Sequence, residues 1–419
     1  MGGGRAFSDC LPYKFLYYWI VSCPEQHSRL SPSGRWLLSW LFSIFQNVSR
    51  ALTIVSAAST PGRLRATGAL FLALASCSCA GRPLQGVLIP SAESAEGGSR
   101  IPVLIATTRQ RSTSDPGEMF NSERGPSMSY GQIAVSIPPD DSRKVGDIQW
   151  PPSPPGDPHR DFVTVSAEYL DKPGFSAALA STAKRMRRSK AMVFVHGFNN
   201  RFDDAAYRLA QIVQDSKAPV IPVLFSWPSR GVVSLSAYQD DRESANESRQ
   251  ALEEVLDTVA LSRNIKEITV VCHSMGCQLT MEALRSRSIR GGKVGAKVRN
   301  VLLVAPDVDF NVFREQMRQV GNNRPRFALF LSQDDHALKI SKSIWGGATR
   351  LGDVNPEQEP YKSELAHERV MVFDVSHLEG DPHSRAFDDV DSVMGMIERR
   401  LATGQQLEED PKRVAVVAE

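Results

Sequence analysis

Ser274 lies in the stretch VVCHSMGC (residues 270–277), between a run of β-branched residues and a helical pattern. A serine at a sharp turn from strand to helix is held above the edge of the sheet, where the first N–H groups of the helix can stabilise a developing negative charge. The turn needs small residues two positions before and after the serine. Gly276 meets this need, whereas Cys272 stands where glycine is usual. The stretch predicts Ser274 as a nucleophile; a structural serine in a tight turn is the alternative.

The segment FVHGFNN (194–200) ends an earlier apolar strand. The pair His196 and Gly197 at that point allows the next backbone N–H, that of Phe198, to point toward a site beside the nucleophile. Together with the N–H of Met275, it would form an oxyanion hole with two donors. A simple turn at the strand end is the alternative for His196 and Gly197.

An acid and a base are expected after the nucleophile, in the chain order Ser, Asp or Glu, His. Asp334 and Asp335 directly follow an apolar strand, and Asp307 and Asp309 follow the strand before it. Each of the four is a candidate for the acid, because a carboxylate at such a position can orient a histidine. The alternative for each is a loop or helix-cap carboxylate.

His377 and His383 are the candidates for the general base, because both lie in the loop after the last expected strand. His377 is nearer to the strand end, and His383 precedes the C-terminal helical pattern. His273 is adjacent to the nucleophile, so its side chain is expected to point away and to have a structural role. His336, beside the candidate acids, is expected to be a loop residue.

Strand-like and helical patterns alternate from residue 101 onward. Continuous apolar runs such as 191–197 indicate strands buried on both faces, as in a parallel sheet. Strands are expected at 101–108, 130–139, 191–197, 218–229, 267–272, 298–307, 326–335 and 368–376, and helices at 201–216, 252–259, 277–286 and 388–401. A polar loop is expected over 109–129 and a Pro-rich connection over 150–160. This alternation predicts an α/β fold with a mostly parallel, helix-covered sheet.

Several segments resemble successive signatures of a bacterial α/β-hydrolase family of unknown function, within the esterase/lipase superfamily. They are HGFNNRFDDAAYRLAQ, PVLFSWPSRG, YQDDRESANES, CHSMG, APDVD, SQDDHAL and the DVS and PHS segments, with VLIATTRQR and YGQIAVSIPP upstream. The resemblance covers roughly residues 101–400. It implies the α/β-hydrolase fold, with a mostly parallel central sheet, helices on both faces and a Ser-Asp-His triad. It does not imply a particular substrate.

The resemblance also implies a role for particular residues. Ser274 corresponds to the nucleophile. The family's Asp-x-Ala-Leu pattern matches Asp335 and favours it over the other acids, and the family's His-Ser pair matches His383. SWPSRG and YQDDRES suggest no chemistry of their own. Trp227 and Tyr238 within them either line a substrate pocket or pack in the core, and packing is commoner for aromatic residues after a buried strand.

The N-terminal part of the chain has a different composition. Residues 1–76 hold seven Lys and Arg against two Asp and Glu, so the rest of a chain with net charge +2 is mildly acidic. We expect residues 1–60 to be a doubtful extension, 61–76 a lipoprotein-like signal segment with a short apolar core, and Cys77 the lipid-modified residue. A tether over 77–100, a hydrolase domain over 101–404 and a flexible tail over 405–419 would follow.

The sequence therefore predicts a serine hydrolase that acts on carboxylic esters through an acyl-enzyme. It would be anchored to a membrane of the bacterial cell envelope through lipid on Cys77, on the periplasmic side. Neither a cofactor nor a metal is expected, because a Ser-Asp-His triad needs none. The spacing of Cys79, Cys272 and Cys277 indicates neither a zinc site nor a disulfide framework. An acidic working domain argues against nucleic acid as a partner. Another acyl hydrolase (thioesterase, amidase or phospholipase) and a non-catalytic binding protein of the same fold are the alternatives.

Overall fold

The computed structural model describes residues 82–394, except for 84, 92, 94, 114–116, 292–295 and 345. The predicted segments 1–60 and 61–76, Cys77 and the tail 405–419 lie outside the described residues. Within the expected tether, Val87 and Leu88 are buried against the domain. Among the described residues, no helix has the length and apolar character needed to cross a membrane.

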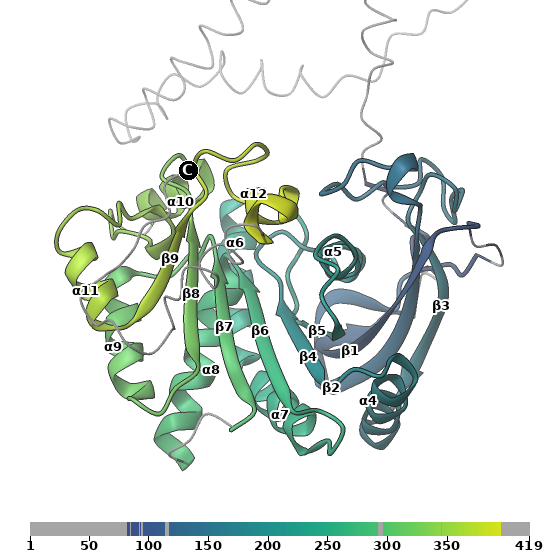
Figure 1. Cartoon of the computed structure of the whole chain (residues 1–419), viewed down its shortest axis with the longest axis horizontal. Coiled ribbons are helices and arrows are strands. Elements are labelled where there is room, and N and C mark those ends of the chain that lie inside the picture. Colours follow the sequence, from purple (N-terminus) through teal and green to yellow (C-terminus); the bar gives the residue numbers. More distant parts are fainter. Residues whose placement is uncertain are drawn as a thin grey trace, which may run out of the picture. The chain divides into compact units, whose positions relative to one another are not determined.

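A nine-stranded sheet forms the centre of the described part of the chain, in the order β3-β2-β1-β5-β4-β6-β7-β8-β9 (Figure 1). The strands are β1 (Ser99–Arg111), β2 (Phe120–Ile137), β3 (Val163–Leu170), β4 (Lys190–Val195), β5 (Val220–Ser226), β6 (Glu267–His273), β7 (Val298–Val304), β8 (Arg326–Leu331) and β9 (Val370–Asp374). The β1–β2 and β2–β3 pairs are antiparallel, and all the other pairs are parallel.

Helices cover both faces of this sheet. They are α4 (Lys172–Met186), α5 (Phe202–Asp215), α6 (Leu235–Glu247), α7 (Arg249–Leu261), α8 (Met275–Gly291), α9 (Phe310–Val320), α10 (His336–Ile344), α11 (Tyr361–His367) and α12 (Arg385–Asp388), with short 3-10 turns η2 (Asp140–Ser142) and η3 (Leu351–Asp353). The apolar side chains of α4, α7, α8 and α9 share one core, and those of α5 and α12 share a second core on the opposite face. Figure 1 shows α5 and α12 on the near face of the sheet and α7 and α8 behind it. The predicted fold class is confirmed.

The structure corrects the sequence-based prediction at several places. The polar loop expected over 109–129 is largely strand, because β1 runs to Arg111 and β2 begins at Phe120. Much of this far end of the β1–β2 hairpin is exposed to solvent, so its sequence lacks the alternation of apolar and polar residues that predicts a strand. The helices α4, α6, α9, α10 and α11 and the strand β3 were not predicted. His336, expected in a loop, is the first residue of α10.

Candidate active site

Four connections at the carboxyl ends of parallel strands carry the predicted site residues. Ser274 stands between β6 and α8, and Phe198 lies between β4 and α5. Asp335 lies between β8 and α10, and His383 lies in the loop between β9 and α12. Ligands of open α/β sheets bind at this edge, because the loops that follow neighbouring parallel strands meet there.

Ser274 occupies a strained turn between strand and helix. Its φ is 51°, in the left-handed region that non-glycine residues rarely adopt, and the residue is 5% exposed. Its backbone N–H donates to Val304 O at 3.0 Å, which ties the turn to the end of β7. A Cβ added at Gly276 would lie 2.2 Å from His196 O, so strand and helix approach too closely there for any side chain. This is the geometry expected of a nucleophile turn.

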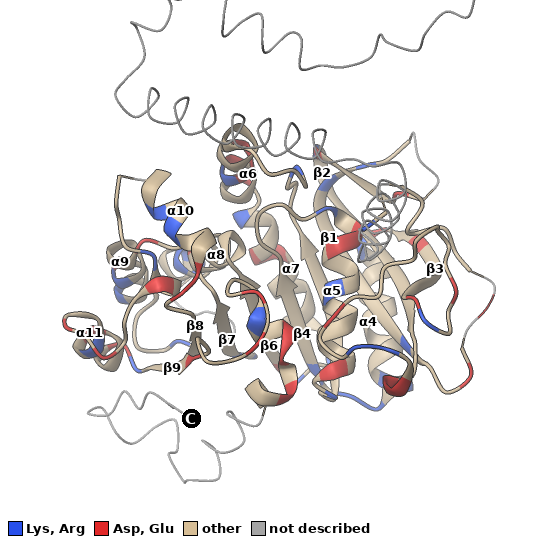
Figure 2. Ribbon diagram, turned by 90° about the horizontal axis from the view of Figure 1, so that it is seen from above, with Lys and Arg blue, Asp and Glu red and all other residues tan. Residues whose placement is uncertain are grey.

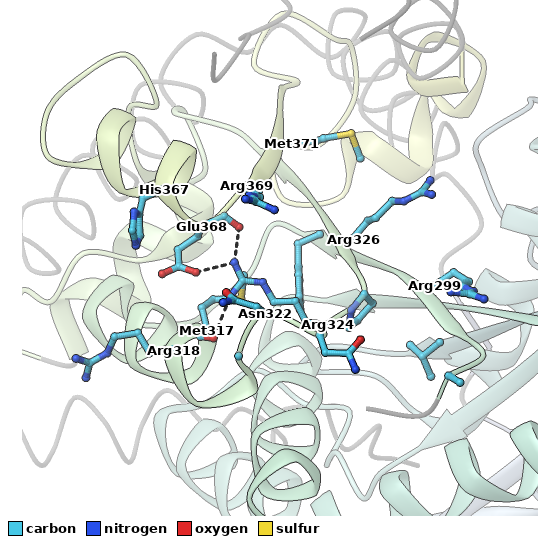
Figure 3. A pocket seen from close by; sticks show the side chains of 16 residues that line it. Arg299, Met317, Arg318, Asn322, Arg324, Arg326, His367, Glu368, Arg369 and Met371 are labelled. Atoms are coloured by element: carbon cyan, nitrogen blue, oxygen red, sulfur yellow. Dashed lines mark hydrogen bonds and ion pairs between the residues drawn. The ribbon is translucent and has the colours of Figure 1, made fainter. Parts of the chain in front are cut away.

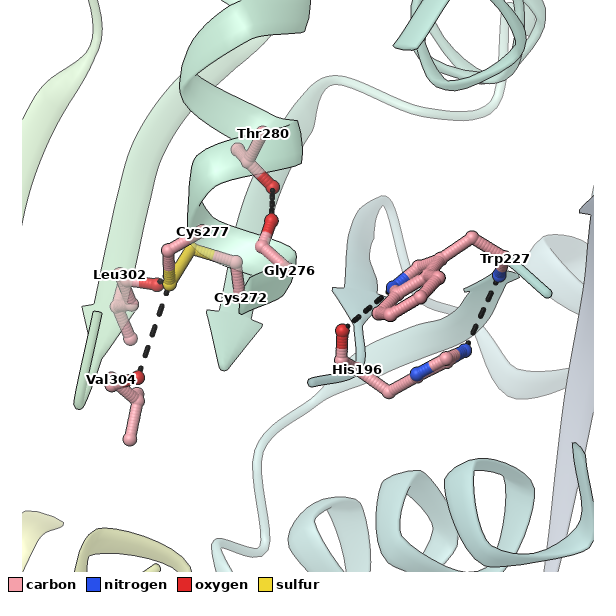
Figure 4. Close-up of a disulfide and its surroundings, with 8 residues drawn as sticks. All are labelled: His196, Trp227, Cys272, Gly276, Cys277, Thr280, Leu302 and Val304. Carbon is pink, nitrogen blue, oxygen red and sulfur yellow. Dashed lines mark hydrogen bonds between the residues drawn. A yellow bond between two sulfur atoms is a disulfide. The ribbon is translucent and has the colours of Figure 1, made fainter. Parts of the chain in front are cut away.

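The elbow also contains a disulfide between Cys272 and Cys277 (Figure 4). The prediction that the cysteines form no disulfide was therefore wrong. The two cysteines are five positions apart, and the sharp turn from strand to helix between them brings their Cα atoms to 4.9 Å. Neither a continuous strand nor a continuous helix would bring residues at this spacing together. Cys272 is the small residue two positions before Ser274, where glycine is usual. Its side chain is buried together with that of Cys277 in one hydrophobic core. The bond joins the end of β6 to the first turn of α8 on either side of the serine.

His383 and Asp335 form the central contact of the site. The His383 Nδ1 atom lies 2.7 Å from Asp335 Oδ2, and the Asp335 carboxylate is fully buried. The second carboxylate oxygen, Oδ1, accepts the backbone N–H of Leu338 at 3.0 Å, in the first turn of α10. With Nδ1 engaged, the ring nitrogen left for a proton from serine is Nε2. A buried carboxylate held in this way fixes the orientation of the imidazole.

His273 joins the loop of His383 to the nucleophile turn. Its Nε2 lies 2.9 Å from His383 O, and the two rings have centroids 4.8 Å apart. Burial lowers the pKa of His273 to about 3, so the ring is neutral and can donate to this carbonyl. The structural role expected for His273 is thus a support for the base. Among the described residues, no hydrogen bond joins Ser274 Oγ to His383; catalytic contacts of this kind often close only when substrate is bound.

The other three candidate acids are held by different partners. Asp334 pairs with Arg385, 3.0 Å away, and its side chain is half exposed. Asp307 is buried and accepts Tyr238 OH and Ser341 Oγ. Asp309 caps the N-terminus of α9 through Asn311 N at 2.8 Å.

His377, the alternative base, is exposed, and the structure gives it no contact with a described carboxylate. Of the candidate pairs, only Asp335 and His383 are brought together in the described part of the chain.

Two backbone N–H groups face the region of Ser274. A Cβ added at Gly197 would lie 3.0 Å from the Ser274 Cβ, so the loop that carries Phe198 passes directly over the serine. Met275 is the first residue of α8, so its N–H is one of the free donors that begin a helix. No described acceptor is bonded to the N–H of Phe198 or of Met275. Both are therefore free to donate, and their role as an oxyanion hole stays a prediction.

Arg109 and Asp241 hold the loop of Phe198 from beneath, and sequence reasoning assigned no role to either residue. Both side chains are buried. The Arg109 guanidinium donates to four oxygens of the neighbouring segments: Ser226 Oγ at 2.8 Å, Ser229 O at 3.1 Å, Asn121 O at 3.2 Å and Asn200 O at 2.8 Å. The Asp241 carboxylate accepts Ser229 Oγ at 2.5 Å and Arg230 N at 2.7 Å, and it also bonds the backbone N–H of Asn199.

The contacts of Arg109 and Asp241 give a structural role to the SWPSRG and YQDDRES segments. Ser229 comes from the first and Asp241 from the second, and together they fix Asn199 and Asn200, the residues that follow Phe198. Trp227 is fully buried and stacks on His196, with ring centroids 4.9 Å apart. The role favoured for it, core packing, is confirmed. Tyr238 also packs, with its ring against Phe198.

Replacing Asp241 with asparagine is expected to lower the free energy of unfolding by about 3 kcal/mol, because a buried network around Arg109 loses its negative charge. The carboxylate accepts three hydrogen bonds, and in the amide an NH₂ group faces one of those three donors, so that hydrogen bond is lost. Urea unfolding of the full chain measures this. Asp240→Asn is the control, since Asp240 forms ion pairs at the surface and should cost less than about 1 kcal/mol. Equal losses in the two variants would contradict the role given to Asp241.

His196 is a neutral part of this scaffold. Burial, followed by the nearby Arg109 charge, lowers the pKa of His196 to about 3. Its Nδ1 donates to Gly197 O at 2.9 Å, since a carbonyl can only accept. Its Nε2 accepts the N–H of Trp227 at 3.2 Å (Figure 4). The Nε2 contact joins the end of β4 to the end of β5, and the Nδ1 contact holds the turn that follows β4.

The free energy of unfolding is expected to fall as the pH is lowered through about 6.5, because His196 then gains a proton only in the unfolded chain. The folded pKa is depressed, so the stabilisation is complete above pH 6.5 and declines down to about pH 3. The expected slope is up to about 1.4 kcal/mol per pH unit for one histidine. Urea unfolding between pH 7 and pH 5 measures it in the full chain and in His196→Asn. The variant should show the shallower slope, and identical slopes would refute the assignment.

The fold, the strained serine turn and the buried carboxylate on a histidine define an α/β-hydrolase. The chain belongs to the family described as alpha/beta hydrolase of unknown function (DUF900), whose model matches residues 173–399. No curated protein is significantly similar to it in sequence.

Among solved structures, the chain is similar to a predicted CIB-like hydrolase from Thermoplasma acidophilum, at 13% identity and a TM-score of 0.29. The match covers 51% of this chain and 86% of that chain. Among the described residues, no group of His, Cys, Asp and Glu is arranged to hold a metal ion.

Proposed function

We propose that the protein is a serine hydrolase that cleaves carboxylic esters, with Ser274 as nucleophile, His383 as general base and Asp335 as the orienting acid. The observation that supports this most strongly is the 2.7 Å contact between His383 Nδ1 and the buried Asp335 carboxylate. In the part of the chain that the structure describes, it is the one contact between a histidine and a carboxylate at the edge of the sheet where Ser274 lies.

The reaction would proceed in two steps through an acyl-enzyme. His383 Nε2 takes the Ser274 proton as Oγ attacks the acyl carbon, and the N–H groups of Phe198 and Met275 bind the oxyanion. Collapse breaks the bond to the leaving alcohol, which takes the proton from His383. Water then attacks the acyl carbon with His383 as base, which releases the acid and restores the serine. Asp335 stabilises the imidazolium in both steps.

Hydrolysis of p-nitrophenyl esters tests this proposal. The purified full chain is assayed with a series of acyl chains from short to long, beside His383→Gln. Release of nitrophenol that the variant lacks is the expected result. Matched thioester and anilide substrates decide between an esterase, a thioesterase and an amidase, since one triad serves all three reactions. A folded wild-type chain with no turnover of any of them would favour the non-catalytic binding protein.

We also propose that the protein is anchored in the cell envelope through lipid on Cys77. The proposal rests on the sequence alone, because Cys77 lies outside the described residues. The support is the short apolar core that precedes a cysteine in LASC (residues 74–77). Expression in a bacterial host with and without globomycin tests it: an unchanged mass of the processed protein would exclude lipoprotein processing.

A further inference from the structure

A cleft of about 690 Å³ opens at the amino ends of β7, β8 and β9, the edge of the sheet opposite to Ser274 (Figure 3). Its walls hold five arginines and a histidine against a single carboxylate, that of Glu368. The basic residues are Arg299, Arg318, Arg324, Arg326, Arg369 and His367. Elsewhere on the described elements, acidic and basic residues are interleaved (Figure 2). The cleft is therefore a local concentration of positive charge.

The acidic residue of the cleft is already neutralised. Glu368 forms a buried ion pair with Arg324 at 2.8 Å, and the same guanidinium also donates to Glu368 O and to Met317 O. Arg318 pairs with Glu315 outside the cleft. The structure gives the guanidinium groups of the remaining three arginines (Arg299, Arg326 and Arg369) no ion pair or hydrogen bond with a described residue. Figure 3 draws no hydrogen bond or ion pair from any of the three to the other residues of the cleft.

Strand register makes two of these arginines neighbours along the cleft wall. Phe327 pairs with Val370 across β8 and β9, so the preceding residues, Arg326 and Arg369, are neighbours at the ends of adjacent strands. Arg369 is the turn residue directly before β9, and its φ of 52° lies in the left-handed region. Two basic side chains therefore start from adjacent positions of the cleft wall.

We propose that this cleft binds a phosphate-bearing ligand through Arg299, Arg326 and Arg369. A planar guanidinium matches the oxygens of a phosphate with two parallel hydrogen bonds. The volume of about 690 Å³ falls within the range of roughly 300–1,000 Å³ of small-molecule sites, so it exceeds what inorganic phosphate needs. Val298, Met317 and Met371 supply apolar wall for the rest of the ligand.

The site is distinct from the proposed catalytic centre. It uses the amino ends of β8 and β9, whereas Asp335 and His383 follow the carboxyl ends of the same two strands. A ligand in the cleft cannot contact Ser274. Binding can therefore be measured whether or not the chain is a hydrolase.

Calorimetric titration of the full chain with pyrophosphate at low salt tests the proposal. The double variant Arg326→Gln, Arg369→Gln should weaken the pyrophosphate affinity at least tenfold. Arg187→Gln is the matched control, because Arg187 is also exposed and has a φ of 53° but lies at the end of α4, outside the cleft. Far-UV circular dichroism verifies that each variant is folded. If the double variant does not fold, Arg299→Gln alone replaces it, with an expected loss of several-fold.

A flotation assay distinguishes a free phosphate compound from a lipid headgroup. Vesicles of phosphatidylglycerol in phosphatidylcholine are compared with phosphatidylcholine alone. Pyrophosphate binding that depends on the arginines supports a free phosphorylated ligand, and binding to the anionic vesicles alone, lost in the double variant, supports a headgroup. Binding of equal strength in the wild type and the double variant, or no binding of either probe, would overturn the proposal.

Discussion

Replacing Ser274 with alanine is expected to lower kcat for ester hydrolysis by about a million-fold, to a rate that is set by the remaining oxyanion donors. The Oγ atom is the proposed nucleophile, and the turn places no other hydroxyl at its position. The small change in volume at a residue that is 5% exposed should leave the fold intact. Steady-state rates on the best p-nitrophenyl ester measure the effect.

Ser288→Ala is the control for this substitution. Ser288 lies on the same helix, α8, but more than three turns from the elbow, and its hydroxyl makes a long bond to Val320 O. Its kcat should equal that of the wild type. A Ser274→Ala variant with more than about a hundredth of the wild-type rate would mean that another group attacks the ester.

Asp335→Asn is expected to reduce kcat by about ten thousand-fold with little change in KM. The amide has the size of the carboxylate, but it can offer N–H to His383 Nδ1. The ring would then carry its proton on Nε2, the atom that must accept the serine proton. The Leu338 N–H contact can persist, so the variant should fold.

Asp334→Asn distinguishes the acid from its neighbour. Asp334 is half exposed and pairs with Arg385, so its loss should reduce kcat less than tenfold. If Asp334→Asn lowers kcat as much as Asp335→Asn does, the orientation of His383 would depend on the whole loop rather than on the Asp335 carboxylate.

The central sheet could be predicted from the sequence because its parallel strands are buried on both faces. The run 191–195 is a continuous, fully buried apolar segment, and in 268–272 Thr269 is the one polar residue. The outer ribbon of β1 and β2 could not be predicted in full, since its far end is polar and solvent-exposed. Helix α6 was missed because its buried face includes Asp241 and Ser244, which give no apolar period.

Part of the site was predictable for a related reason. Ser274 and its neighbours are local in sequence, and chain order narrowed the acid and the base to a few residues. The buried pair of Arg109 and Asp241 could not be predicted, because its hydrogen-bond partners are distant along the chain. Neither residue is part of an apolar repeat that would indicate burial. The Cys272–Cys277 bond likewise depends on the tight turn between them. The repeated acids in YQDDRES were the one available signal for Asp241.

The most direct test of the central claim is covalent labelling of the full chain by a fluorophosphonate, with the modified peptide identified by mass spectrometry. Such a probe reacts with a serine only when a base activates it. The account predicts one adduct, on Ser274, that is absent from Ser274→Ala and strongly reduced in Asp335→Asn. A folded wild-type chain that remains unlabelled, or an adduct that persists in Ser274→Ala, would contradict it.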